Sequence, residues 1–285
     1  MMEKFRFGMS SCGAQNLTAT EFEQFAQAGV KELELSFAST RYDSLQWSDI
    51  KKRADEYGIH LWSFHLPFMP FDRINIADCD RKVREYSVAY SEELIKKAAD
   101  IGIKIMVIHP SGEPNAEEKR EEAMKNAQES LAHIAEVATQ CDATVAVENL
   151  PRTCLGRNSA EIKRLISVDE RLRVCFDTNH LLSQPTKEFI LDVGEQIITT
   201  HFSDYDFVDE KHWLPGEGLI DWKELIETLE QIGYNGPILY ELGFAPKASI
   251  ERRMLTCDDF RLNHYRLKNK LPIQAIGRPV REAGG

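Results

Sequence analysis

Short apolar runs alternate with longer amphipathic segments along most of the chain. The short runs are rich in Val, Ile, Leu and Phe, which is the composition of strands buried on both faces. The longer segments place apolar residues three or four positions apart, which predicts helices that lead from one strand to the next. The pattern therefore predicts eight strands, at 5–10, 30–37, 59–68, 103–110, 143–150, 172–178, 197–203 and 237–243.

Helices are predicted between these strands, and capping residues mark several of their ends. Suitable first residues are Thr18, Asp78, Asn158 and Asp221, and glycines such as Gly29 follow the last turn. The helices are predicted at 19–28, 48–57, 78–101, 116–140, 159–168, 187–193, 222–232 and about 249–267.

Eight strand–helix units in about 250 residues match the size of a (β/α)8 TIM barrel, an α/β fold. No Pro/Ser-rich linker, low-complexity stretch or repeat interrupts the series, so a single barrel domain is predicted over residues 1–270. Residues 271–285 contain two prolines and two terminal glycines and are predicted to form a C-terminal extension outside the barrel. A doubly wound open sheet is the alternative, but it would not require eight strands.

The formal net charge of −11 argues against a nucleic-acid partner, because DNA binding depends on lysines and arginines that neutralise phosphates. The six cysteines form no C-x-x-C pair and suggest neither a zinc knuckle nor a disulfide framework. The N-terminal stretch MMEKFRFGMSSCGA is charged where a signal peptide is apolar, and no apolar run is long enough to span a membrane. We therefore expect a cytoplasmic protein that does not bind membranes.

Polar residues end six consecutive predicted strands, and in a TIM barrel the C-terminal ends of all strands meet at one rim. These residues are His65, His109, Glu148, Asp177 with His180, His201 and Glu241. The strand starts carry mainly Lys31, His60, Lys104 and Arg173, without a group of acids and imidazoles. A lone histidine after a strand is usually a hydrogen-bonded loop residue. The concentration at one rim instead indicates a functional site.

Carboxylates and imidazoles that converge in one mouth are most simply held together by a divalent cation. Two glutamates, one aspartate and one histidine form a mostly oxygen ligand set, which admits Mn, Mg, Co or Zn without selecting among them. His65, His109, His180 and His212 could complete a larger cluster, orient the ligands or bind substrate hydroxyl groups. The spacing does not separate these roles.

Seven motifs resemble the xylose-isomerase-like barrel superfamily, which contains sugar isomerases, sugar epimerases and zinc-dependent apurinic-site endonucleases. They are FHLPF, VIHPSGEP, VENLP, FDTNH, HFSDYD, HWLPGEGLIDW and YELGF, and the resemblance extends from Phe5 to about Leu267. No single motif is decisive, but their order and spacing together are specific. The PGEG-L-I-DW element is typical of the sugar isomerase and epimerase branch.

The resemblance implies that Glu148, Asp177, His201 and Glu241 hold the metal. It also implies that Glu148 and Glu241 are the catalytic acid and base, and that His180 contacts the substrate. In such a reaction a cation stabilises an enediolate while one carboxylate removes a carbon-bound proton and the other returns it. The implied substrate is a small carbohydrate: a sugar, a sugar phosphate or an inositol-derived ketone. Related barrels often associate, so a homo-oligomer stays open.

Five further residues near the predicted rim are candidates for substrate binding: His65, His109, His212, Arg152 and Trp213. Arg152 could meet an acidic or phosphorylated substrate. Aromatic residues such as Trp62 and Trp213 could stack on the C–H faces of a sugar. Ketose 3-epimerases carry an arginine six residues after the metal histidine, and Phe207 replaces it here. This departure leaves the identity of the sugar open.

Two alternatives differ in class from an isomerase. The endonuclease branch shares the pattern and adds His65, His109, His180, Glu210 and His212 to the metal ligands, although Glu210 replaces the usual aspartate. The acidic charge and the lack of basic inserts at the rim argue against DNA repair. The second alternative is a barrel that binds a sugar without converting it. The pair Glu148 and Glu241 argues against it, because a binder needs no opposed proton-transfer groups.

Overall fold

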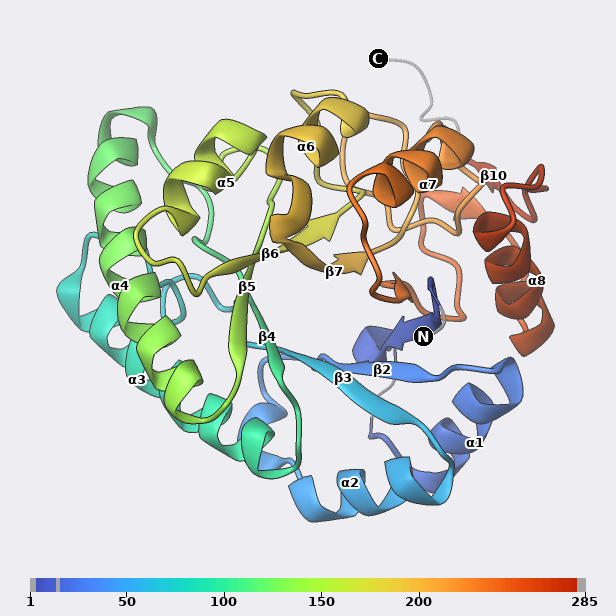
Figure 1. The fold of residues 1–285 in the computed structure, drawn as a ribbon, viewed down its shortest axis with the longest axis horizontal. Coiled ribbons are helices and arrows are strands. Elements are labelled where there is room, and N and C mark those ends of the chain that lie inside the picture. Colours follow the sequence, from blue (N-terminus) through green and yellow to red (C-terminus); the bar gives the residue numbers. More distant parts are fainter. Residues whose placement is uncertain (1–3, 14–15, 281–285) are drawn as a thin grey trace.

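The structure, a computed structural model, describes residues 4–13 and 16–280 and forms the predicted single-domain (β/α)8 barrel. Eight parallel strands follow the order β7-β6-β5-β4-β3-β2-β1-β8 (Figure 1). They are β1 (Phe7–Ser10), β2 (Glu32–Leu35), β3 (His60–His65), β4 (Ile105–Ile108), β5 (Thr144–Glu148), β6 (Arg173–Asp177), β7 (Ile197–His201) and β8 (Ile238–Tyr240). Each lies within a predicted apolar run, so the predicted fold class is confirmed.

The barrel closes between β7 and β8 through backbone hydrogen bonds just beyond the ends of these strands. The amide of Phe202 donates to the carbonyl of Leu239 at 2.7 Å, and the amide of Glu241 donates to the carbonyl of Phe202 at 3.2 Å. This closure brings the residue that follows β8, Glu241, next to the end of β7.

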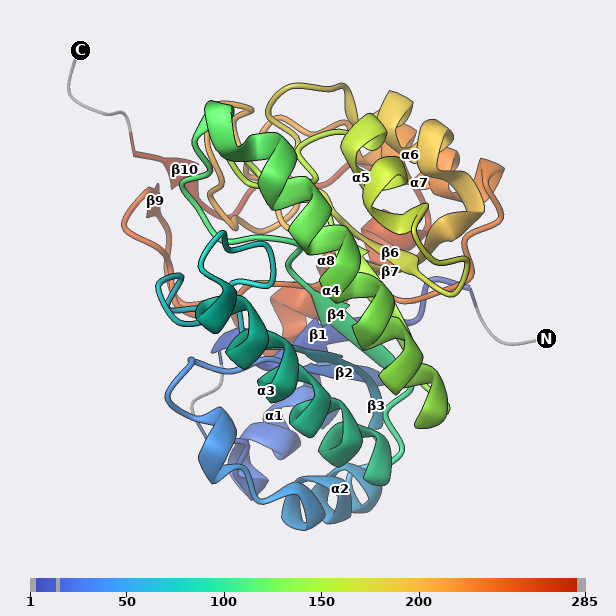
Figure 2. The ribbon, with the colours of Figure 1, turned by 90° about the vertical axis from the view of Figure 1, so that its left-hand side faces the viewer.

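Helices cover the outside of the barrel, as Figures 1 and 2 show. Apolar side chains of the helices and strands pack together in the hydrophobic core. The helices are α1 (Ala19–Ala28), α2 (Trp47–Glu56), α3 (Arg81–Asp100), α4 (Arg120–Gln140), α5 (Ser159–Ile166), α6 (Thr186–Val193), α7 (Trp222–Gln231) and α8 (Cys257–Lys268). Short 3-10 turns occupy Ser11–Gly13, Tyr42–Ser44, Glu117–Lys119 and Gly194–Gln196. None of the helices within the described residues combines the length and apolar character that a membrane span requires.

Three helices begin later than predicted, each for a local reason. α3 begins at Arg81 because Asp80 accepts the capping hydrogen bond from the amide of Lys82 at 2.8 Å. α4 follows the 3-10 turn at 117–119. α8 begins at Cys257 because the preceding residues are extended, and β9 (Ile250–Glu251) pairs antiparallel with β10 (Arg278–Pro279).

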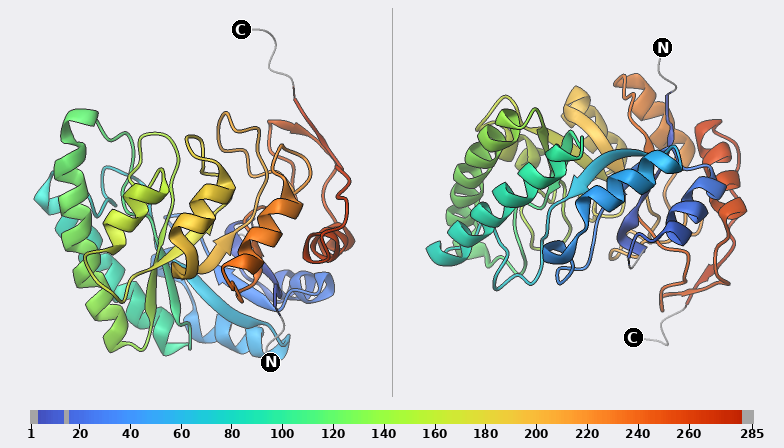
Figure 3. Two further views of the ribbon diagram at one scale, coloured as in Figure 1. Left: turned by 45° about the horizontal axis from the view of Figure 1, so that its top comes forward. Right: turned by 90° about the horizontal axis from the view of Figure 1, so that it is seen from below.

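The predicted C-terminal extension is described as far as residue 280, and residues 281–285 lie outside the described part. From α8 the chain returns along the barrel to the β9–β10 pair (Figure 3). Ile273 and Ile276 pack against the hydrophobic core, and the amide of Gly277 donates to Oε1 of Glu217 at 2.8 Å. Residues 271–280 therefore pack against the loop after β7 and stabilise it.

An ionic cluster occupies the N-terminal end of the barrel. Glu32 on β2 contacts the guanidinium of Arg6 and lies 2.6 Å from Nδ1 of His60 through Oε2. The guanidinium of Arg6 also lies over the ring of Trp62, 5.2 Å from its centre. The prediction that the strand starts lack an acid–imidazole group was therefore wrong. So was the placement of Trp62 at the rim, because β3 begins at His60 and Trp62 is near its start.

The buried carboxylate of Asp204 organises the long loop after β7. Its two oxygens accept from the amide of Gly216 at 2.7 Å, the indole Nε1 of Trp222 at 2.8 Å and the amide of Ile220 at 3.2 Å. A side chain at Gly218 would meet this carboxylate, since its Cβ would lie 2.3 Å from Oδ1 of Asp204. The segment PGEGLIDW thus folds around the carboxylate of Asp204, whose hydrogen bonds fix its conformation.

We expect the Asp204→Ala variant to lose about 3 kcal/mol or more of unfolding free energy, because several buried donors lose their acceptor at once. Urea unfolding followed by circular dichroism measures this change. The matched control is Asp206→Ala in the same loop, whose half-buried carboxylate accepts from amides of 208 and 209 and should cost about 1 kcal/mol or less. Equal losses in the two variants would contradict this role of Asp204.

Candidate active site

The predicted rim residues converge at the C-terminal end of the barrel. His65, Glu148, Asp177 and His201 are the last residues of β3, β5, β6 and β7. His109 and Glu241 directly follow β4 and β8. Parallel strands of matched register bring these ends to one level, which explains why residues far apart in sequence meet.

Glu148 is the centre of this group, and only 1% of its surface is exposed. Its Oε2 lies 3.1 Å from Nε2 of His65 and 3.3 Å from Nε2 of His109. Its Oε1 lies 3.2 Å from Nδ1 of His201. One carboxylate therefore connects three imidazoles from three strands.

The four residues implied as metal ligands lie close enough to share one ion. One ligand atom each from Glu148, Asp177, His201 and Glu241 lies within 4.8 Å of the other three. The buried oxygens Oδ2 of Asp177 and Oε2 of Glu241 have no hydrogen-bond partner. Unpartnered buried carboxylate oxygens are costly without a counter-charge. The donor set and its two unpartnered oxygens fit a divalent cation.

The pKa values of Glu148 and Asp177 shift in opposite directions, although both side chains are buried. Burial raises the pKa of a carboxyl group, but at Glu148 nearby imidazoles, that of His201 first, outweigh it and hold the pKa well below its usual range. At Asp177, burial and the carboxylates of Glu241 and Glu148 raise the pKa well above its usual range. A bound cation would relieve this crowding of acids.

Glu34 belongs to the site but was missed in the sequence. It lies on β2 and is fully buried, and its Oε2 lies 3.0 Å from Nε2 of His201 and accepts from the hydroxyl of Ser63 at 2.8 Å. The signal was present, because Glu32 and Glu34 alternate with Leu33 and Leu35 and so point into the barrel. With Nε2 held by Glu34, His201 presents Nδ1 to the other three ligands.

We expect Glu34→Leu to weaken divalent-metal binding roughly 10–100-fold, because His201 would lose the acceptor that fixes its ring and its tautomer. Competition against a chelating dye measures the affinity. Ser63→Ala is the matched control, since it removes a neighbour of Glu34 and keeps the contact to His201. An unchanged affinity in Glu34→Leu would show that His201 needs no such support.

A second group of possible ligands, His180, Glu210 and His212, lies beside the first. Nδ1 of His180 donates to the carbonyl of Asn149 at 2.9 Å, and its Nε2 lies 3.2 Å from Oε2 of Glu210. Burial lowers the pKa of His180, but Asp177 and Glu210 outweigh it and raise the pKa to about 10. These two acids therefore favour the protonated imidazole of His180.

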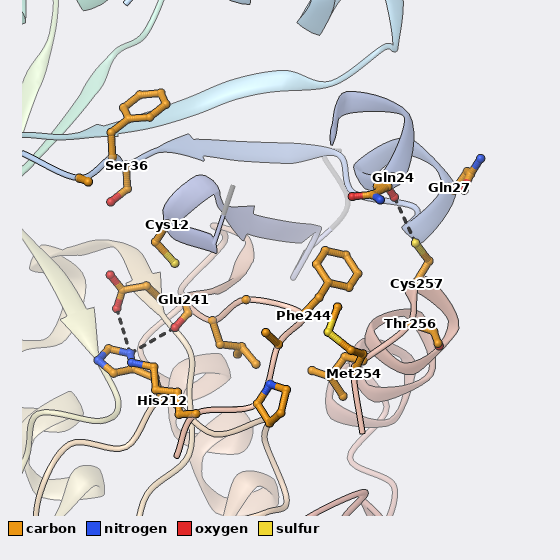
Figure 4. A pocket seen from close by; sticks show the side chains of 18 of the residues that line it. Cys12, Gln24, Gln27, Ser36, His212, Glu241, Phe244, Met254, Thr256 and Cys257 are labelled. Atoms are coloured by element: carbon orange, nitrogen blue, oxygen red, sulfur yellow. Dashed lines mark hydrogen bonds and ion pairs between the residues drawn. The ribbon is translucent and has the colours of Figure 1, made fainter. Parts of the chain in front are cut away.

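His212 comes from the loop after β7 and faces the ligand Glu241. Its Nδ1 lies 3.2 Å from the carbonyl oxygen and 3.6 Å from Oε2 of Glu241, and Figure 4 shows the two side chains at the inner end of a pocket. The backbone of His212 has a φ of 52°, a conformation that non-glycine residues rarely adopt and that tends to occur at functional sites.

Arg152 and Trp213, both predicted to bind substrate, are occupied by other contacts. The guanidinium of Arg152 binds the carboxylate of Glu113. Its Nη1 donates to Oδ1 of Asp209 at 2.7 Å, and its Nη2 donates to Oε1 of Glu210 at 3.1 Å. It thereby ties three rim loops together. Trp213 is only 2% exposed and donates its indole N–H to the hydroxyl of Ser249 at 3.0 Å, so it offers little surface to a ligand.

Comparison with known proteins gives the family of the fold. A family model described as xylose isomerase-like TIM barrel matches residues 22–255. The solved structure of a D-tagatose 3-epimerase-like protein superimposes with a TM-score of 0.78 at 22% identity and covers 93% of this chain and 99% of that chain. At this identity the match supports the fold.

Three curated relatives extend the comparison. The uncharacterized protein MJ1311 of Methanocaldococcus jannaschii is 27% identical over 83% of this chain and 83% of its own. The L-ribulose-5-phosphate 3-epimerase UlaE of Shigella flexneri is 24% identical over 74% of this chain and 76% of its own. A probable endonuclease 4 of Aquifex aeolicus is 31% identical, over 41% of this chain and 40% of its own.

Proposed function

The chain belongs to the xylose isomerase-like TIM barrel family, and on that premise we propose that it is a divalent-metal-dependent epimerase or isomerase of a carbohydrate. The observation that carries this proposal is the buried group of Glu148, Asp177, His201 and Glu241, in which two acids keep an unpartnered oxygen. The similarity to UlaE, an L-ribulose-5-phosphate 3-epimerase that aligns over 74% of this chain, supports the same reaction class.

Glu148 and Glu241 are the proposed proton-transfer pair. Glu148 is the last residue of β5 and Glu241 directly follows β8, and both offer a carboxylate oxygen to the same space. One carboxylate would remove the proton from a carbon next to a carbonyl, and the other would return it to the resulting enediolate. A cation held by the four ligands would supply charge stabilisation for the oxygens of the substrate.

The surrounding side chains would orient the substrate and the acids. His180 is buried, and its Nε2 lies 3.2 Å from Oε2 of Glu210, so it would contact a substrate oxygen once the substrate displaces the Glu210 carboxylate. His65 and His109 hold Oε2 of Glu148 and so would direct Oε1 toward the shared space. Phe68 stacks on His109 at 4.3 Å between ring centres and would keep water from this side.

Solvent deuterium exchange tests the proposal. The metal-loaded protein is incubated in D2O with a panel of ketoses, sugar phosphates and inositol ketones, with and without added Mn2+, and proton NMR follows each carbon-bound proton. We expect deuterium at one carbon of one substrate class and only with metal. A protein that binds a sugar without any exchange would be a non-catalytic binder, and the proposal would fail.

An apurinic-site endonuclease is the second candidate, because two more ligand groups adjoin the first. His65 and His109 share Glu148, and His180 and His212 share Glu210. Such an enzyme would hold about three metal ions and cleave a duplex that contains an abasic site. The net charge of −11 opposes duplex binding. Metal content together with a cleavage assay on an abasic oligonucleotide separates the two candidates.

A further inference from the structure

A cavity of about 1010 Å³ leads from the proposed catalytic centre outward over the rim. Its inner end is formed by Glu241 and His212, and Figure 4 shows both side chains facing it. From there it passes Cys12 and Phe244 and ends between α1 and the start of α8, near Gln24 and Cys257. Pockets for drug-sized ligands measure about 300–1,000 Å³. This cavity therefore has room for more than one sugar ring.

The outer part of the cavity has mostly apolar walls. Phe244 and Met254 line it from the long loop after β8, whereas Phe68, in the loop after β3, lines the inner part of the cavity beside His109. The ring of Phe244 packs on Phe260 of α8, 5.1 Å between centres, which fixes its orientation. The side chain of Met254 is 60% exposed and lines the cavity. Such walls suit the face of a second ring.

The charges along the cavity do not suit a phosphate. Among the described residues that line it, Lys247 is the one lysine or arginine. A nearby cationic side chain, Arg252, is bound to Glu217 at 2.9 Å. Phosphate sites in barrels of this kind commonly use the loops after the seventh and eighth strands and a helix N-terminus. In the loop after β8, Arg252 and Arg253 are paired with Glu217 and Asp259, and Lys247 is the cation of this loop that lines the cavity.

The helix N-terminus that borders the cavity is already neutralised. Thr256 and Cys257 of α8 line the cavity, but Thr256 caps the helix in a reciprocal pair with Asp259. The amide of Thr256 donates to Asp259 at 2.7 Å, and Asp258 adds a second acid in the first turn. These acids occupy the place where a helix would otherwise attract an anion.

We propose that the substrate is an unphosphorylated sugar that carries its ketone at a carbon other than the anomeric carbon, and whose anomeric carbon is joined by a glycosidic bond to a second, uncharged ring. The keto-sugar would lie at Glu241 and His212, and the second ring would lie against Phe244 and Met254. This inference rests on the proposed function for the reacting sugar. A second ring is favoured over a phosphate because the cavity is large, its outer walls are mostly apolar and one cationic side chain lines it.

Three substrates test this inference on the metal-loaded full chain: a free ketose, the same ketose with a terminal phosphate, and an aryl glycoside whose sugar carries its ketone at a carbon other than the anomeric carbon. We expect the aryl glycoside to have the highest kcat/KM in the exchange assay. Met254→Glu should raise KM for the aryl glycoside roughly tenfold or more, because a charge would face the second ring. The control Leu191→Glu, at an exposed site on α6, should leave KM unchanged.

Calorimetric binding of an unreactive aryl glucoside separates this inference from the proposed function. If the aryl glucoside binds, if its binding weakens in Met254→Glu, and if no sugar exchanges deuterium, the proposed reaction is wrong and the assignment of the cavity holds. A preference for the phosphorylated ketose that disappears in Lys247→Gln would overturn the inference and leave the reaction class intact. Absence of aryl glucoside binding would also overturn it.

Discussion

Glu148→Gln and Glu241→Gln should each lower the rate of epimerisation or isomerisation by about 10²–10⁴-fold, the usual contribution of a positioned acid or base. Glutamine keeps the size of the side chain and an oxygen that can contact a metal, but it cannot accept the carbon-bound proton. Proton NMR in D2O measures both substrate conversion and solvent exchange for each variant.

The buried acid Glu32 provides the control for these two variants. It is also a glutamate inside the barrel, only 5% exposed, but it lies at the opposite end against Arg6 and His60. Glu32→Gln should retain turnover while it lowers stability. Full epimerisation in Glu148→Gln or Glu241→Gln would assign proton transfer to other groups. Equal losses in all three variants would point to damage to the fold.

Removal of the metal should produce the second large effect, a loss of thermal stability that added Mn2+ reverses. When the free ion concentration is a thousand times the dissociation constant, binding stabilises the folded state by about 4 kcal/mol. Without it, the carboxylates of Asp177, Glu241 and Glu148 crowd together in a buried space. Differential scanning calorimetry of chelated and Mn2+-loaded protein measures the change. Identical midpoints would contradict a metal bound by the folded state.

Asp177→Asn is the informative companion to this measurement. The folded-state pKa of Asp177 is raised by burial and by neighbouring acids, so its ionisation costs stability in the metal-free protein. That cost is absent below the unfolded pKa and grows as the pH rises toward the folded pKa. Metal-free Asp177→Asn should therefore be at least as stable as the wild type at neutral pH, and its midpoint should respond less to Mn2+.

The sequence predicted the barrel because each strand is short, apolar and bounded by recognisable helices. It also predicted the convergence of Glu148, Asp177, His201 and Glu241, because the C-terminal ends of barrel strands share one rim. Glu34 was not predicted as a site residue, because it lies within β2 and not at the C-terminal end of that strand. Its alternation with leucines would have revealed that it points inward.

The loops were less predictable, because their conformations depend on contacts between distant segments. Arg152 looked available for an anionic substrate, but Glu113, from the loop after β4, occupies its guanidinium together with Asp209 and Glu210. Trp213 looked like a rim aromatic, but the strand-like pairing of its backbone with Asp204 turns it into the interior. Local sequence does not specify such pairings.

Anomalous scattering from a Mn2+-soaked crystal would show whether Glu148, Asp177, His201 and Glu241 bind a metal ion. An anomalous difference map locates the ion independently of any substrate or activity. We expect a peak coordinated by Glu148, Asp177, Nδ1 of His201 and Glu241. A map with no peak among these four residues, at a Mn2+ concentration that supports activity, would contradict the proposed metal site.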